Sequence, residues 1–256
     1  NQAQGETMSE ERSAAASFAY YAGIGGASLA LLGILGIQTG LLPPLTGFYL
    51  FSLGTLVGGL FTLVMGAIAL FTTRNQSAGQ GQKRARIATV VGVVLMGVVL
   101  TAGLPGREFP PINDITTNLE DPPEFAPASR VPDYADFDMN YPAEFVPIVG
   151  GAYPDLQTVE PGLAPANAYA AAIQAARSLG WEITDENRAG GSFDATDTTQ
   201  IFRFVDDITV RVRGQSSGSA IDIRSRSRVG RGDLGANALR IQAYAEALAG
   251  DSGATH

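Results

Sequence analysis

Three long apolar runs without a charged residue occupy most of the first hundred positions of the chain. They cover residues 17–37, 48–71 and 87–104. A bilayer core of about 30 Å needs about 20 helical residues to cross it, and all three runs are in range. Helices can cross because they satisfy their own backbone hydrogen bonds in lipid. One such run would also suit a buried core helix, but three in succession predict three transmembrane helices.

The charges of the connecting loops predict an orientation. The first loop, residues 38–47, is uncharged. The second loop is basic, with Arg74, Lys83, Arg84 and Arg86 and no acidic residue. Basic loops stay in the cytoplasm. We therefore expect a cytoplasmic tail over residues 1–16 and everything after Leu104 on the other side of the membrane. In a bacterial inner membrane, that side is the periplasm.

Small residues repeat at helical spacing within the first two runs. They are Ala22, Gly26, Ala30, Gly54 and Gly58. Such stripes let helix backbones approach closely. They serve either packing among the three helices or docking onto another membrane protein, and we favour packing. Because the runs hold no charged residue, we expect no proton relay or ion path inside them.

The chain after Gly106 is acidic, with 22 acidic residues against 12 basic ones, a difference of −10. This charge argues against a general affinity for nucleic acid. The chain has no cysteine, and its one histidine is the last residue, His256. Thiolate nucleophiles, cysteine-ligated metals and histidine-based catalytic sites are therefore excluded from any ordered site. We expect no metal, no cofactor and no catalytic residue. The expected partners are the lipid bilayer and either other integral membrane proteins or a second copy of this chain.

A proline-rich stretch follows the third run. Twelve of the 14 prolines fall within residues 105–165, so this stretch cannot be helical for long. Apolar residues are nevertheless spaced along it. We therefore expect residues 105–163 to form an extended arm that lies over a folded domain.

Regular patterning begins at residue 164 and predicts a domain over residues 164–250, followed by a tail at 251–256. Helical spacing appears at 166–179 and 236–249, and strand patterns appear at 181–184, 192–196, 201–204, 208–212 and 220–225. Residues 215–218 predict a hairpin turn between the last two strands. This order predicts an α+β domain of two layers with an antiparallel sheet, tethered to a membrane bundle of three helices in hairpin arrangement.

Charged residues cluster in the strand region. Asp206 and Asp207 are adjacent, so they point to opposite sides of an extended strand and make a poor acid–base pair. A predicted strand carries an arginine at every second position, so these side chains share one face: Arg224, Arg226 and Arg228. Three guanidinium groups on one face could bind an anion, or could pair internally with aspartates, and we favour internal pairing.

Several longer motifs carry a resemblance to a known family. They are residues 110–117 (PPINDITT), 121–125 (DPPEF), 204–207 (FVDD), 222–230 (DIRSRSRVG), 233–237 (DLGAN) and 240–241 (RI). Together they resemble the bacterial "domain of unknown function 1499" family, over about Pro110 to Leu248. Membrane-anchored members with hydrophobic N-terminal spans look similar to the whole chain. The resemblance implies no established reaction.

The matching motifs are mainly polar. If the arm motif packs against the loop before the last helix, one polar cluster would form. Its members would be Asp114, Thr116, Thr117, Asp206, Asp207, Arg224, Ser225, Ser227, Arg228, Asp233, Asn237 and Arg240. Such a cluster is either an internal network that fixes the arm or a binding site, and we favour the network.

Two functions follow as hypotheses. The first is a non-catalytic accessory or scaffold subunit that docks into a larger membrane complex and presents a periplasmic domain. The second is a periplasmic binding module or enzyme that uses the Asp/Arg/Ser cluster on an anionic or polar envelope ligand. The two hypotheses differ in geometry: a binding site requires four side chains to converge on an open pocket, namely Arg224, Arg228, Asp114 and Asp233.

Overall fold

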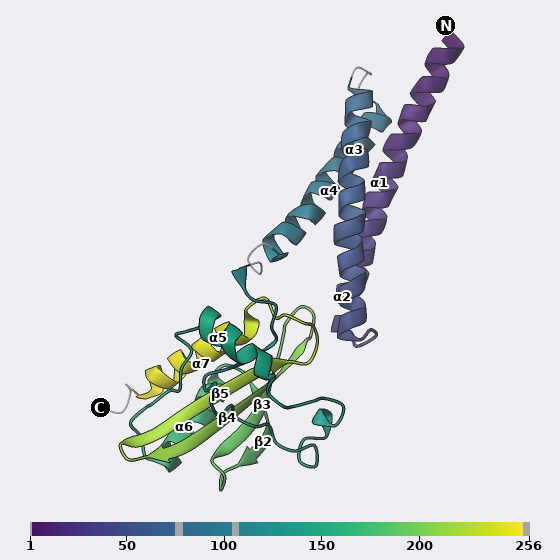
Figure 1. The fold of residues 1–256 in the computed structure, drawn as a ribbon. Helices are drawn as coiled ribbons and strands as arrows, with labels where there is room; N and C mark the ends of the chain where they lie inside the picture. The colour runs from purple at the N-terminus through teal and green to yellow at the C-terminus, as the bar shows by residue number, and fades with distance from the viewer. Residues whose placement is uncertain (1, 75–78, 104–107, 253–256) are drawn as a thin grey trace. The chain divides into compact units, whose positions relative to one another are not determined.

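The computed structural model describes residues 2–74, 79–103 and 108–252, and it describes side chains for 14–74, 79–101 and 108–250. The chain divides into two compact units: residues 1–105 with 200–203, and residues 106–199 with 204–256. Figure 1 labels most of the helices and strands of both.

The first unit is helical. It contains α1 (Gln2–Gln38), α2 (Pro44–Ser52), a π-helical turn (Leu53–Gly58), α3 (Gly59–Thr73) and α4 (Gln80–Gly103). Three helical stretches, Ala14–Gln38, Pro44–Thr73 and Gln80–Thr101, are long and apolar enough to cross a membrane. The three predicted helices are confirmed, and they suggest a membrane protein.

The helices extend beyond the predicted apolar runs. The third helix begins at Gln80 rather than residue 87, because lysine and arginine are good helix formers and continue the helix outside the apolar run. The second begins at Pro44, since proline suits the first turn of a helix. The predicted end at Leu104 and the predicted start of the arm at Pro105 lie outside the described residues.

Glycines set the packing of α1 against the π-helical turn. A Cβ on Gly26 would come within 3.0 Å of the Gly54 carbonyl oxygen and 3.2 Å of the Gly58 Cα. A Cβ on Gly54 would lie 2.7 Å from the backbone nitrogen of Ala30. Four of the five small residues of the predicted stripe therefore lie in a seam inside the helical unit, while Ala22, one turn before Gly26, is half-buried.

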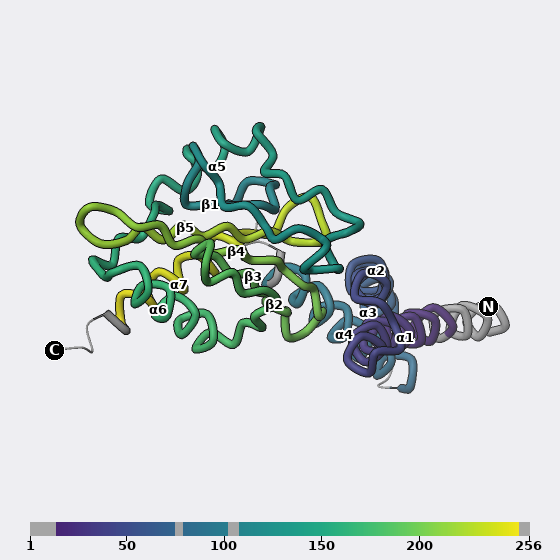
Figure 2. The backbone as a smooth tube through the Cα atoms, turned by 90° about the horizontal axis from the view of Figure 1, so that it is seen from below, coloured from purple at the N-terminus to yellow at the C-terminus, as the bar shows by residue number. Residues whose placement is uncertain are grey.

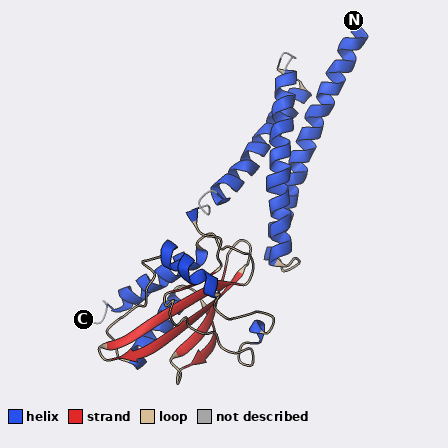
Figure 3. Ribbon diagram, viewed as in Figure 1, coloured by secondary structure: helices blue, strands red, loops and turns tan. Residues whose placement is uncertain are grey.

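The second unit is built on one antiparallel sheet. Its strands are β1 (Asp114–Thr116), β2 (Glu182–Asn187), β3 (Ser192–Thr198), β4 (Val205–Gln215) and β5 (Gly218–Ser227), in the order β1-β5-β4-β3-β2. Figure 3 shows the strands in red with the helices beside them. The predicted combination of a helical bundle with an α+β domain and an antiparallel sheet is confirmed.

One face of the sheet is apolar and carries two helices. Ile208, Val210 and Ile223 are fully buried on this face, where α6 (Pro165–Ser178) and α7 (Ala236–Ser252) contact the strands. Figure 2 shows both helices on the same side of the sheet. The alternation seen along β4 and β5 therefore fixes which face forms the main core.

The arm covers the opposite face. It contributes β1, which pairs with β5, and the short helix α5 (Val146–Ala152). A small apolar cluster of Phe125, Ala126, Val131 and Tyr134 anchors it. The arm therefore belongs to the domain, because without it β5 would be an open sheet edge.

Three local details differ from the sequence pattern. The predicted strand at 201–204 is wrong: the segment is a turn in which the Thr199 N–H donates to the Phe204 carbonyl at 2.8 Å, and Arg203 has φ 54°. Strand β1 and helix α5 were not expected within the proline-rich arm. Strand β1 is short enough to fit between Pro111 and Pro122, and α5 carries Pro147 in its first turn, where proline is tolerated.

Candidate functional site

Sheet register gathers charged residues on the arm-covered face. Directly opposite residues of antiparallel strands share a face. Asp114 lies opposite Arg226, and Arg226 lies opposite Asp207. Asp222 lies opposite Arg211 in the same way. The face that one would expect to meet solvent is thus charged, yet the arm buries it.

Arg224 and Asp114 form the most buried ion pair. Arg224 Nε donates to Asp114 Oδ1 at 2.9 Å and Nη2 donates to Oδ2 at 2.7 Å, a bidentate arrangement. The arm supplies two more acceptors, the carbonyl oxygens of Pro123 at 3.3 Å and Met139 at 3.0 Å. Burial raises the pKa of Asp114, and the hydrogen bonds from Arg224 oppose this rise.

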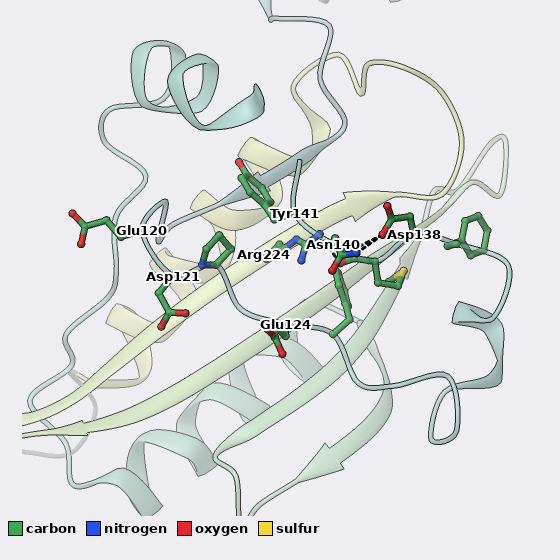
Figure 4. Close-up of a pocket in the computed structure, with 11 residues that line it drawn as sticks. Glu120, Asp121, Glu124, Asp138, Asn140, Tyr141 and Arg224 are labelled. Carbon is green, nitrogen blue, oxygen red and sulfur yellow. Dashed lines mark hydrogen bonds between the residues drawn. The ribbon is translucent and has the colours of Figure 1, made fainter. Parts of the chain in front are cut away.

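An open pocket of about 550 Å³ lies over Arg224. The rings of Phe125 and Tyr141 lie 4.8 Å and 5.2 Å from the guanidinium carbon. Figure 4 shows Arg224 in the middle of the pocket, surrounded by the carboxylates Glu120, Asp121, Glu124 and Asp138. The one cation of this pocket is therefore already paired, and its rim is acidic, so the pocket is poorly suited to an anion.

Arg228 is bound by two aspartates. Its Nε and Nη2 donate to Asp207 at 3.0 Å and 2.8 Å, and Nη1 donates to Asp133 of the arm at 3.1 Å. Hydrogen bonding to Asp207 raises the pKa of Arg228. The pair ties the end of β5 to β4 and to the arm.

Asp222 is another fully buried acceptor on this face. Arg211 and Arg213 donate to its Oδ2 at 3.0 Å and 2.7 Å. From the arm, the Thr158 hydroxyl donates to Oδ1 at 2.6 Å. Arg226, on the same face, instead donates to the Met139 sulfur at 2.8 Å and lies 5.4 Å from the centre of the Phe137 ring, both in the arm.

Asp194 is different, because no arginine lies against it among the described side chains. Its Oδ2 accepts the backbone N–H of Ala126 at 2.7 Å. Burial raises the pKa of Asp194 to about 6, and the Ala126 hydrogen bond opposes the rise. Through the Ala126 hydrogen bond this carboxylate holds the arm to β3, at a cost in desolvation.

A separate network lies on the helix-covered face. Arg240 of α7 donates to Asp206 at 2.6 Å and to Asp197 at 2.9 Å. Its Nη1 also donates to Ser225 Oγ at 3.1 Å and Asn237 Oδ1 at 2.9 Å. Asn237 in turn accepts from Ser225 at 2.6 Å, while its Nδ2 donates to Ser227 Oγ at 2.9 Å.

The remaining polar residues of the predicted set have local structural contacts. Asp233 accepts the backbone N–H groups of Gly235 and Asn237 at 2.9 Å and 2.8 Å, so it caps the start of α7. Thr117 Oγ1 accepts the Ile223 N–H at 2.9 Å. Thr116 Oγ1 accepts the Asn118 N–H at 3.3 Å.

The expected single cluster is therefore divided into two by the sheet. Asp114, Arg224, Asp207 and Arg228 lie on the arm-covered face. Asp206, Ser225, Ser227, Asn237 and Arg240 lie on the helix-covered face. Arg224, Arg228, Asp114 and Asp233 do not meet at one open pocket. Among the described residues, no group of three or more acidic or histidine side chains could hold a metal ion.

Sequence reasoning left out several members of these networks. Asp194, Asp197 and Arg211 take part but were not candidates. Arg211 could have been found, because it alternates with the buried Ile208, Val210 and Val212 of β4. Asp194 and Asp197 sit in a strand without such a strict pattern, and only the sheet register places them.

Comparison with known proteins identifies the domain. A family model described as "Protein of unknown function (DUF1499)" matches residues 114–248. The match starts at the first residue of β1 and ends within α7, so it includes both networks. It confirms the resemblance seen in the motifs. The comparison with curated proteins finds no match.

Proposed function

Because the match covers more than half of the chain, the protein belongs to the DUF1499 family, and we propose that it is a non-catalytic, membrane-anchored accessory or scaffold subunit. In this proposal the three helices dock into a larger membrane assembly of a bacterial inner membrane. The C-terminal domain is presented in the periplasm. The basic loop with Arg74, Lys83, Arg84 and Arg86 supports this orientation.

One observation carries the proposal: three buried or largely buried arginines of the domain each pair with a buried aspartate. The pairs Arg224–Asp114, Arg228–Asp207 and Arg240–Asp206 are all closed by hydrogen bonds of 2.6–3.0 Å. A general base or nucleophile needs a group free to meet substrate. Side chains that hold the arm and α7 in place suit a rigid presented surface instead.

The glycine seam limits which surfaces of the helices are available for docking onto a partner. Gly26, Gly54 and Gly58 contact one another inside the unit, so they do not form the docking surface. The outward faces of the helices are apolar, with Leu31, Leu32, Phe61 and Val64 exposed. In the proposal these faces meet both lipid and partner helices.

Native gels of the full chain after gentle detergent extraction test the proposal. We expect a species larger than the monomer, and two differently tagged copies expressed together separate a self-assembly from a complex with other proteins. A monomer in every extract, across detergents of decreasing harshness, would contradict the accessory role.

A further inference from the structure

The two carboxylates opposite Arg226 in the sheet are bound by other arginines. Asp114 and Asp207 face Arg226 from the strands on either side of it. The carboxylate of Asp114 binds Arg224, and the carboxylate of Asp207 binds Arg228. A guanidinium carries five N–H groups and no acceptor of its own. The donors of Arg226 therefore turn to other acceptors.

Arg226 donates to a thioether of the arm. Its Nη1 lies 2.8 Å from Met139 Sδ, and its guanidinium carbon lies 5.4 Å from the centre of the Phe137 ring. A thioether sulfur is a weak acceptor, and a ring face attracts a cation only through its quadrupole. A charged donor is thus directed at an acceptor that binds it weakly.

The same short segment of the arm also covers Arg224. Arg224 Nη2 donates to the Met139 carbonyl at 3.0 Å, and the Tyr141 ring lies 5.2 Å from the guanidinium carbon. Residues 137–141, here called the strap, therefore contact β5 through two arginines. The strap lies in no helix or strand, so its position depends on side-chain contacts of this kind.

Met139 is open to small oxidants. It lines the pocket of about 550 Å³ shown in Figure 4, and part of its surface is exposed. Of the four methionines of the chain, it is the only one after Gly106. Met65 and Met96 fall within the apolar spans, where lipid would shield them from oxidants in water. Because the chain has no cysteine, Met139 carries the one sulfur of the domain that a peroxide can oxidise.

We propose that Met139 is a site of oxidative modification, at which the sulfoxide oxygen accepts a charge-assisted hydrogen bond from Arg226 and tightens the strap on β5. A sulfur lone pair attacks one oxygen of hydrogen peroxide and forms the S–O bond while the O–O bond breaks. The proton on the transferred oxygen passes to the departing hydroxide, which leaves as water. The sulfur is oxidised by two electrons, and the peroxide is reduced by two.

The facing cation reverses the usual effect of this modification. Oxidation turns an apolar side chain into a polar one and normally disrupts the packing around a methionine. At Met139 the new oxygen meets a guanidinium, and hydrogen bonds to a charged donor are the stronger ones. The inference concerns the domain alone and does not depend on the accessory role.

Peptide mass spectrometry of the full chain in phosphatidylcholine nanodiscs tests the oxidation. Hydrogen peroxide is added, and the oxidised fraction of each methionine-containing peptide is followed over time. We expect Met139 to oxidise at least about tenfold faster than Met65 and Met96, because susceptibility follows exposure to the oxidant. Oxidation of Met139 at the rate of the two methionines in the spans would overturn the proposal.

Hydrogen exchange of the backbone amides in the strap tests the effect on the arm. After oxidation, we expect exchange over residues 137–141 to slow about threefold, because the strap opens less often. Met139→Leu should show no slowing after peroxide treatment. Arg226→Leu should abolish the slowing, whereas Arg188→Leu, at an arginine that is 76% exposed, should keep it. Unchanged or faster exchange in the oxidised natural chain would overturn the proposal.

A further variant removes the need for peroxide. Met139→Gln places a carbonyl acceptor near the position of the sulfoxide oxygen and leaves Arg226 in place. Relative to Met139→Leu, it should also slow exchange of the strap about threefold. Equal exchange in these two variants would overturn the proposal, even if Arg226→Leu failed to fold. All these measurements use only this protein and lipid, so failure of the accessory role leaves their results intact.

Discussion

Arg224 has the largest fully buried side chain among the described residues, with 1% of its surface exposed. Removing a charge from water costs free energy that only a close partner and further hydrogen bonds offset. Asp114 and two carbonyls of the arm supply these bonds. The pair therefore specifies where the arm lies more than it adds to net stability.

We predict that Arg224→Met lowers the free energy of unfolding by about 3–5 kcal/mol, because Asp114 remains buried without its partner. The double variant Arg224→Met with Asp114→Asn should recover part of this loss. Urea unfolding of the purified full chain, followed by the fluorescence of the only tryptophan, Trp181, gives the values. Arg188→Met is the matched control, since Arg188 is 76% exposed. A loss as large in the control would argue against the buried-charge explanation.

Asp194 gives a pH dependence with a defined sign. Its pKa rises from 3.8 to about 6 in the folded domain, so the folded state binds this proton more tightly than the unfolded state. The contribution of Asp194 to stability is therefore largest below pH 3.8 and is lost as the pH rises through 6.

Asp194→Asn should remove that loss, because an amide oxygen can still accept the Ala126 N–H. Relative to the natural chain, the variant should gain stability on the order of 2–3 kcal/mol between pH 4 and pH 7. Urea midpoints measured at half-unit pH steps would show it. Other buried carboxylates titrate in both proteins and cancel in the difference. A constant difference across the pH range would contradict the assignment.

At the scale of elements, close helix packing depends on the glycine seam between α1 and the π-helical turn. A side chain on Gly54 would overlap the Gly26 carbonyl oxygen, whereas a Cβ on Gly25 meets nothing within 4 Å. The two positions therefore offer a matched pair of substitutions in the same unit.

We expect Gly54→Leu to separate α1 from the π-helical turn and Gly25→Leu to be tolerated, because lipid-facing positions accept large apolar side chains. The fraction of monodisperse protein after heating in detergent, measured by size-exclusion chromatography, reports the difference. If the two variants retain the same fraction of monodisperse protein, the glycine seam is not the basis of helix packing.

Elements with a strict periodic pattern could be predicted from the sequence. The three helices of the first unit and the alternating strands β4 and β5 belong to this group. β1 could not be predicted, because three residues between prolines carry no period and form a strand only by pairing with β5. The turn at 201–204 is apolar like a strand, and its left-handed Arg203 is not visible in the pattern.

The sequence predicted which residue types form the site, but not that the sheet separates them into two networks on opposite faces. Alternation predicted that Arg224 and Arg228 share a face, and the structure places both there with aspartate partners. Asp206 and Asp207 can pair with these arginines only if their side chains lie on the same face of the sheet. Adjacent residues must separate, so the sheet sends Asp206 to Arg240 and Asp207 to Arg228.

At the scale of the whole molecule, the distribution of charge along the chain predicts how it crosses a membrane. Within residues 14–104 the basic residues all lie in one short region, from Arg74 to Arg86, and the chain after Gly106 is acidic. The positive charges favour the cytoplasmic side, whereas acidic residues contribute little to orientation. The basic loop alone should therefore place the domain outside.

Thiol labelling in spheroplasts measures this orientation directly, because the chain has no cysteine of its own. We expect a membrane-impermeant maleimide to label Ser217→Cys in the hairpin of the domain but not Gln82→Cys, in the basic first turns of α4, until the cells are lysed. Both positions lie in described, solvent-accessible segments, so lysis serves as the internal control for reactivity. Replacing Arg74, Lys83, Arg84 and Arg86 with serine should produce a mixed population, since the charge bias is then lost. Labelling of Gln82→Cys in intact spheroplasts would contradict the predicted orientation, because it would show that the domain faces the cytoplasm.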